Sequence, residues 1–343
     1  HGTAHLSLRH CPCRERIRRM NRRSRFKLLF TALCVGWCFL FLRCETTEKS
    51  MVRAVYLART ETGTQVLLWY QAPEASADAS EASAAVQAAG AEGDTLEKAL
   101  SAAEEALPQA ADYRLCDYLL TTPGGADALL ADYEQLVLAR KCGRTAARVS
   151  CTRLSGEDLL EACEKQGGFA DKLLEKLKAH STEMPRLYQH GEAMLLPLLC
   201  RAEEDTAFEK TALLQTGAGQ TELPEAQAEM ARLLAEQPGA KTFWLDEKQV
   251  KIRRCSVSVT LDKNAVCLRL DAQLAAGEPQ PAEAQRAELE ALAVQTVHTF
   301  WQQGADLLAL GPRRAVQAGT NGEMFTTKNA CPEIRADVHF LGF

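Results

Sequence analysis

The sequence has 343 residues, and its 40 basic and 45 acidic side chains give a formal net charge of −5 at pH 7. Hydrophobic residues make up 46% of the chain, so it can bury hydrophobic cores. The residues after the N-terminal segment are enough for roughly two or three domains. Residues 1–27 carry nine of the basic side chains and one acidic side chain, so the remaining body is strongly acidic. An acidic body argues against nucleic acid as a partner, because nucleic-acid-binding proteins present a basic face.

An uncharged apolar run at residues 28–42 follows the basic N-terminal segment 1–27. A transmembrane helix needs about 20 apolar residues, and a signal-peptide core has about 7–15. Residues 28–44 are therefore predicted to be a signal segment or a membrane anchor. The preceding basic residues favour a cytoplasmic N-terminus, so the rest of the chain is expected on the extracytoplasmic side. Met20 is a candidate for the true start.

The segment 50–200 is predicted to form an N-terminal domain of the α/β type. Two short strands are expected first, at 51–60 and 65–70. The alanine-rich segment 72–94 comes next, and it is predicted to be a flexible loop because it has too few bulky side chains to pack.

Helix caps are the clearest local signals in the rest of this domain. Asp94 is the expected N-cap of a helix, with Glu97 as its capping-box partner. Strands and helices then alternate over residues 110–180. Ser155 is the expected N-cap of one of these helices, and Asp158 lies three residues after it.

The segment 201–343 is predicted to form a C-terminal α+β domain. Its clearest element is a hairpin of 250–261 with 266–274, in which apolar and polar residues alternate with period two. A long helix at 281–303 and a last strand at 333–341 follow, and we expect an antiparallel sheet with helices packed on it. The predicted register places six apolar residues on one face of the hairpin: Val257, Val259, Leu261, Val266, Leu268 and Leu270.

For the whole chain the predicted fold class is therefore α+β and multi-domain, with mixed or antiparallel sheets behind the N-terminal segment. The 13 cysteines are irregularly spaced and do not resemble a disulfide framework. Buried free thiols are the favoured interpretation. The hairpin register also keeps Cys255 and Cys267 apart.

No catalytic, cofactor or metal site is predicted. The sequence has no Gly-x-Ser-x-Gly elbow, no His-Glu-x-x-His motif and no Walker A loop. His180 and His190, with Glu183 and Glu192 nearby, could in principle ligate a metal ion. Polar surface side chains are the favoured interpretation of all four.

Three other features also receive structural interpretations. Residues 216–219 contain two glycines after a strand, but the third glycine of a dinucleotide fingerprint is missing, so they are predicted to form a turn. His298 lies within the long helix and is expected to pack there. Asp306 follows that helix and is expected to bond backbone amides near Gly311.

The order of features along residues 44–343 resembles the Ger(x)C family, the membrane-anchored C subunit of bacterial spore germinant receptors. Each motif alone is weak, and their order carries the resemblance. The features are Cys44 after the apolar segment, Gly-Asp-Thr-Leu-Glu-Lys-Ala-Leu at 93–100, a segment at 188–199 that contains Leu-Pro-Leu, and Gln303, Asp306 and Gly311 before the last strand.

The resemblance implies a non-enzymatic, membrane-tethered, extracytoplasmic receptor subunit in the spore inner membrane. Its implied partners are a permease-like integral-membrane subunit and a second membrane subunit. The family places a small residue before the lipidated cysteine, whereas Arg43 precedes Cys44 here. Cys44 is therefore a candidate lipidation site with an atypical lipobox, and an uncleaved helix is the alternative anchor.

Two other functions remain open at this point. The first is an anchored extracytoplasmic solute-binding or envelope-assembly protein with no role in germination. The second is an anchored hydrolase whose site is built from residues scattered along the sequence, although the motif search counts against it.

Overall fold

The computed structural model describes residues 49–71, 85–124, 126–140, 143–202, 205–262, 265–318 and 326–341, together with Lys27, Phe30, Thr31, Leu33 and Cys34. The chain divides into two compact units, His1–Glu48 and Lys49–Phe343. Most of the predicted segments 1–27 and 28–44 lie outside the described residues. None of the described helices is both long enough and apolar enough to cross a bilayer.

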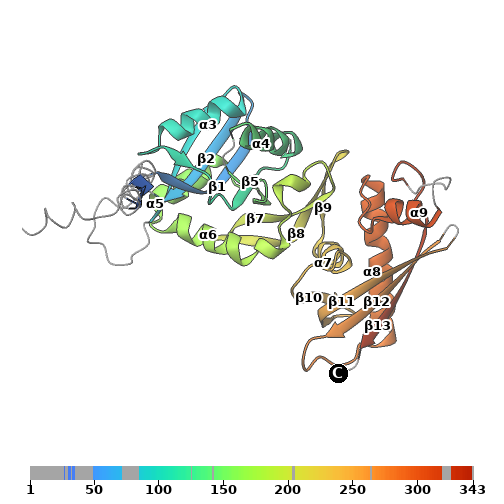
Figure 1. Cartoon of the computed structure of the whole chain (residues 1–343). Coiled ribbons are helices and arrows are strands. Elements are labelled where there is room, and N and C mark those ends of the chain that lie inside the picture. The colour runs from blue at the N-terminus through green and yellow to red at the C-terminus, as the bar shows by residue number, and fades with distance from the viewer. Residues whose placement is uncertain are drawn as a thin grey trace, which may run out of the picture. The chain divides into compact units, whose positions relative to one another are not determined.

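A nine-stranded mixed sheet forms the first part of the unit Lys49–Phe343 (Figure 1). Its strand order is β3-β2-β1-β5-β6-β7-β8-β9, and β4 pairs with β1. Strands β1, β5, β6 and β7 are parallel, and antiparallel strands extend the sheet on both sides. The strands are β1 (Ser50–Arg59), β2 (Thr64–Gln71), β3 (Val86–Gly93), β4 (Ala111–Asp112), β5 (Tyr118–Thr121), β6 (Arg148–Thr152), β7 (Met194–Ala202), β8 (Asp205–Thr216) and β9 (Gly219–Leu223).

Helices cover both faces of this sheet (Figure 1). Val55 and Leu57 of β1 face a core with α3 and α4, whereas Ala54 and Tyr56 face a core with α5 and α6. Successive residues of a strand point to opposite faces, so both faces of β1 are apolar and buried. The helices are α3 (Leu96–Glu105), α4 (Ala126–Arg140), α5 (Gly156–Lys165) and α6 (Phe169–Ala179), and the short 3-10 turns η1 (Ser181–Glu183) and η2 (Leu187–Gln189) precede β7.

The prediction of a flexible loop at 72–94 is wrong for its second half. Strand β3 pairs with β2 along eight residues, with Gly90 opposite Leu67. The small residues of this segment are needed for close packing and do not indicate a flexible loop. A Cβ atom on Gly93 would lie 2.6 Å from the backbone nitrogen of Ala99 in α3. The scarcity of bulk in this segment lets α3 lie close against the sheet.

Of the two predicted helix caps, one is confirmed and one is wrong. Ser155 and Asp158 form a reciprocal capping box at the start of α5. At α3 the N-cap is Thr95, whose hydroxyl accepts a hydrogen bond from the backbone N–H of Lys98. Asp94 instead forms an exposed ion pair with the Lys98 side chain, at 2.8 Å.

A four-stranded sheet in the order β10-β11-β12-β13 forms the second part of the unit. Its buried face packs on α8, through Leu289, Ala293, Val297 and Trp301. These elements are α7 (Glu225–Leu234), β10 (Lys241–Leu245), β11 (Lys248–Asp262), β12 (Ala265–Leu274), α8 (Glu283–Gln302), α9 (Leu310–Ala318) and β13 (Glu333–Leu341).

The predicted hairpin register is confirmed, with Val257 opposite Leu270, Val259 opposite Leu268 and Leu261 opposite Val266. The expectation of an antiparallel sheet is wrong for its last strand, because β13 runs parallel to β12. The chain crosses over through α8 between these two strands, and such a crossover returns the chain in the same direction.

The fold class is α+β with two sheets and packed helices, as predicted. The predicted domain boundary between residues 200 and 201 stays a prediction. It falls within strand β7, and the nine-stranded sheet continues through β9 to Leu223.

Candidate functional site

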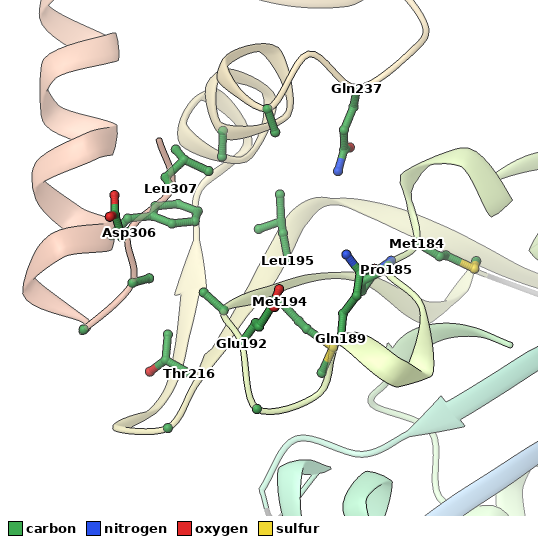
Figure 2. A pocket seen from close by; sticks show the side chains of 18 of the residues that line it. Met184, Pro185, Gln189, Glu192, Met194, Leu195, Thr216, Gln237, Asp306 and Leu307 are labelled. Carbon is green, nitrogen blue, oxygen red and sulfur yellow. The ribbon is translucent and has the colours of Figure 1, made fainter. Parts of the chain in front are cut away.

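A cavity of about 620 Å³ is the candidate functional site (Figure 2). Five chain segments surround it: Arg148 of β6; residues 182–195, which include η2 and the start of β7; the β8–β9 turn; the C-terminal end of α7 with the loop after it; and residues 300–307. We call it the α7–β7 cavity. Its walls come from both parts of the unit Lys49–Phe343.

The apolar wall of the α7–β7 cavity is continuous with a small buried cluster. Ala231 of α7, Phe300 of α8 and Ala305 line the cavity and pack with Leu214 and Leu223 of the nine-stranded sheet. Phe300 lies on the buried side of α8 and is 3% exposed. Its partners differ from those of Leu289 and Trp301, which pack on the four-stranded sheet.

Most polar side chains at the cavity already hold the backbone in place. The Arg148 guanidinium donates to the carbonyl oxygen of Met184 at 2.9 Å. The side-chain oxygen of Gln189 accepts from the backbone N–H of Arg186 at 2.7 Å. Arg148 and Gln189 therefore shape the loop that precedes β7.

Asp306 has the structural role that the sequence predicted. Its carboxylate accepts hydrogen bonds from the backbone N–H groups of Leu310, at 2.7 Å, and Gly311, at 2.8 Å. Both N–H groups belong to the first turn of α9, where helical donors lack partners within the helix. Asp306 thus fixes the loop that joins α8 to α9 at the edge of the cavity.

Gln237 contributes an unpaired polar atom. Its side-chain oxygen is buried and has no hydrogen-bond partner among the described residues. Figure 2 shows the Gln237 side chain pointing into the cavity from the loop after α7. A buried acceptor without a partner costs free energy, so a ligand donor or a water molecule would stabilise it.

The two histidines interpreted as surface residues have different partners. His190 pairs with Glu134 of α4 at 2.5 Å and is largely buried. His180 lies 3.7 Å from Glu183, and its ring packs on Phe208 with centroids 4.5 Å apart. Glu192 is exposed at the rim of the cavity. Within the described part of the chain, no group of three or more His, Cys, Asp or Glu residues could hold a metal ion. The prediction of no metal site remains a prediction.

A buried group of charges beside the cavity was missed by the sequence analysis. Arg232 of α7 is 3% exposed, and its guanidinium lies 2.6 Å from Glu229 and 3.7 Å from Glu183 of η1. Lys241 is also 3% exposed and donates to the carbonyl oxygen of Pro238. Desolvation is the largest effect on the pKa of Lys241, and it lowers this pKa. The carboxylates of Glu229 and Glu183 raise the pKa, and the charge of Arg232 lowers it. The sequence does contain a signal from which these buried charges could have been predicted. Glu229 and Arg232 lie three residues apart on a helix whose other residues are mostly apolar.

The cysteines of the described residues are free thiols. Burial raises the pKa of Cys116 and of Cys151 to about 12. Cys255 lies opposite Ala272 and Cys267 opposite Thr260, as the predicted register requires. Cys44, the candidate lipidation site, lies outside the described residues.

Comparison with known proteins gives one structural similarity. No family model matches the chain, and no curated protein matches it. Among solved structures, the chain is similar to the crystal structure of the GerBC protein, with a TM-score of 0.42 and 13% sequence identity. The match covers 85% of this chain and 98% of that one. At this level the similarity shows neither family membership nor a function.

Proposed function

We propose that this protein is a non-enzymatic, membrane-tethered, extracytoplasmic subunit of a spore germinant receptor. The observation that carries the proposal is the order of sequence motifs between Cys44 and the last strand, which resembles the Ger(x)C family. In this role the chain acts with a permease-like integral-membrane subunit and a second membrane subunit during nutrient-triggered germination.

The motif residues lie where elements of the fold meet, which supports a role based on shape. Gly93 ends β3 where α3 approaches the sheet. The Leu-Pro-Leu stretch lies in β7, with Leu196 and Leu198 buried. Asp306 holds the first turn of α9. Each of these residues determines a packing contact or a loop conformation.

The contacts at the α7–β7 cavity support a non-enzymatic role. Arg148, Gln189 and Asp306 line the cavity, and each is bonded to backbone groups. A catalytic acid or base must instead reach a proton of the substrate. Tethering would add to weak partner contacts, because it raises the local concentration of the domain beside membrane partners.

The α7–β7 cavity favours one second candidate function, the anchored solute-binding protein. Its volume of about 620 Å³ falls within the range of roughly 300–1,000 Å³ that is usual for ligand pockets. Phe300 and Leu195 supply apolar surface, and Gln237 supplies an unpaired acceptor. Such a site would take a small molecule with an apolar body and a hydrogen-bond donor.

Germination of spores from a strain that lacks the gene tests the first proposal. We expect a loss of nutrient-triggered germination that the full chain restores. Unchanged germination with every nutrient that triggers the parent strain would contradict the receptor role.

Ligand binding by the purified full chain tests the second function. A bulky substitution at the cavity wall, Ala235→Trp, should abolish binding of any metabolite that raises the melting temperature of the wild-type protein. The matched control is Ala284→Trp, on the exposed side of α8 and away from the cavity lining. Stabilisation that survives Ala235→Trp would place the ligand elsewhere.

A further inference from the structure

Strand β11 has one edge that is only partly covered. It pairs with β12 from Ile252 to Asp262, whereas β10 pairs only with residues Lys248 to Ile252. Along residues 253–262, which we call the open edge of β11, no other described strand is paired on the side away from β12. The hairpin continues past β10 (Figure 1).

Two side chains bond to the backbone of the open edge. The carboxylate of Glu236 accepts a hydrogen bond from the backbone N–H of Val257, at 2.8 Å. The side-chain amide of Gln317 in α9 donates to the carbonyl oxygen of Leu261, at 3.2 Å. Both backbone groups therefore point away from β12. Because backbone direction along a strand alternates with period two, the N–H and C=O of Val259 point the same way.

These two side chains imitate a neighbouring strand. The Glu236 carboxylate lies where a strand carbonyl would accept, and the Gln317 amide lies where a strand N–H would donate. Between them, the backbone groups of Val259 form no hydrogen bond with any described residue. The open edge thus has polar groups for an extended chain at three alternate residues, Val257, Val259 and Leu261. Glu236 and Gln317 satisfy only one backbone group each, at Val257 and Leu261.

Hollows run along the open edge on both sides of Glu236. One, of about 500 Å³, is lined by Leu233, Arg253 and Arg254. The other, of about 240 Å³, is lined by apolar side chains and Arg313: Leu234, Val257, Val259, Leu307 and Leu308. Both are also lined by Glu236, so its bond to Val257 separates them.

The charges along these hollows indicate the sign of the occupant. Arg253, Arg254 and Arg313 are exposed. Glu236 is the one acidic residue among the described residues that line the two hollows, and its carboxylate is bonded to Val257. An incoming segment with carboxylates would therefore meet unlike charges and little repulsion.

We infer that the open edge of β11 binds an acidic, extended segment of a partner protein as an added strand. Apolar residues on one face of that segment would enter the hollow beside Val259, and acidic residues would lie near Arg253 and Arg254. Main-chain bonds would give affinity and the alternate side chains specificity, as in other cases of strand addition. Glu236 and Gln317 would swing away as the segment binds. The inference rests on the geometry of β11 and not on the proposed receptor role.

Binding of a labelled nine-residue peptide of alternating Val and Glu to the purified full chain, followed by fluorescence anisotropy, tests this inference. Glu236→Ala removes the carboxylate that competes for the Val257 N–H, so it should tighten peptide binding about tenfold. A tenfold change in affinity corresponds to about 1.4 kcal/mol of binding free energy. A peptide of alternating Val and Lys should bind at least about tenfold more weakly. If neither the wild type nor Glu236→Ala binds the acidic peptide at millimolar concentration, the inference is wrong.

Two further variants separate strand addition from simple charge attraction. Val259→Pro removes an N–H that points away from β12, and proline is tolerated at such an edge position, so the protein should fold while peptide binding is lost. Arg253→Glu should weaken binding several-fold, whereas Arg335→Glu on β13 should leave it unchanged. Full peptide binding by a folded Val259→Pro would overturn the inference. Should Val259→Pro fail to fold, equal effects of Arg253→Glu and Arg335→Glu would overturn it.

Discussion

Two consecutive residues of the β10–β11 turn have left-handed backbone angles. Asp246 has φ 47° and Glu247 has φ 56°. A two-residue hairpin turn of this kind matches the twist of its strands, and it usually contains Asn-Gly or Asp-Gly. Glu288 of α8 accepts a hydrogen bond from the Asp246 N–H at 3.0 Å, which helps to hold the turn.

Glu247→Gly is therefore expected to stabilise the protein by about 1 kcal/mol, because a left-handed conformation costs a residue with a Cβ atom about 1–2 kcal/mol. Chemical denaturation of the full chain measures the change. The matched control is Lys248→Gly, one residue later in β11, which should destabilise because glycine is unfavourable within a strand. A loss of stability in both variants would show that the turn is not strained.

The buried Lys241 should make the stability of the folded protein depend on pH. Desolvation lowers its pKa in the folded state, while the unfolded chain titrates near the ordinary value of about 10.4. Between these two pKa values the unfolded state binds more protons, so this residue makes stability rise as pH rises through that window. Below the folded pKa the charged ammonium is a constant cost.

Lys241→Met should remove this rise. We expect the variant to exceed the wild type by about 1 kcal/mol near pH 7, because replacing a buried charge by an apolar side chain is often stabilising. Its advantage should shrink as pH increases toward 10.4. Denaturation at several pH values measures the difference, with the exposed Lys251→Met as control. An advantage that does not change with pH would show that Lys241 does not titrate as described.

At the scale of elements, the β11–β12 hairpin gives the sharpest test of packing. Leu268 is 1% exposed, whereas Val259 opposite it is only half-buried. Leu268→Asp should cost about 3 kcal/mol or more, from lost burial and an unpaired buried carboxylate. Val259→Asp should cost less, and Ser258→Asp on the exposed face should stay within about 0.5 kcal/mol. Thermal or chemical denaturation gives the order. Equal costs for the Leu268 and Ser258 variants would contradict the register.

The elements that the sequence predicted correctly depend on local patterns. The alternation around Asp262 and Ala265 determined the register of the hairpin, since a shift by one residue would expose half of its apolar set. The Ser155 cap was visible because the capping box spans only four residues. Asp94 and Thr95 are both cap residue types, and the choice between them depends on backbone angles that the sequence does not state.

Elements that depend on distant neighbours could not be predicted in the same way. Strand β3 is alanine-rich because α3 packs closely on it, and composition alone resembles a flexible linker. The parallel pairing of β13 follows from the path of the chain through α8. The α7–β7 cavity joins residues more than 100 positions apart, such as Gln189 and Phe300, and no local motif marks it.

At the scale of the whole molecule, packing and charge join the two sheets. The cluster of Leu214, Ala231 and Phe300 contains residues of β8, α7 and α8, and Arg232 of α7 reaches Glu183 of η1. The α7–β7 cavity lies beside these contacts. A solute in the cavity would contact Ala235, just after the end of α7. A strand on the open edge of β11 would lie beside Ala235 and Glu236. This end of α7 is therefore the place where two binding events could affect each other.

The last prediction concerns the tether of the whole chain. Residues 28–44 combine an uncharged core with preceding cations, so cells that express the full chain should retain it in the membrane fraction. Val35→Arg should release much of it, because an arginine at the centre of a membrane segment costs about 2.5–3.5 kcal/mol. Cys44→Ala then distinguishes the two anchors. Loss of retention together with a change in gel mobility would identify a lipid on Cys44, whereas unchanged retention and mobility would identify the helix. Recovery of the wild-type chain in the soluble fraction would contradict membrane tethering by either anchor.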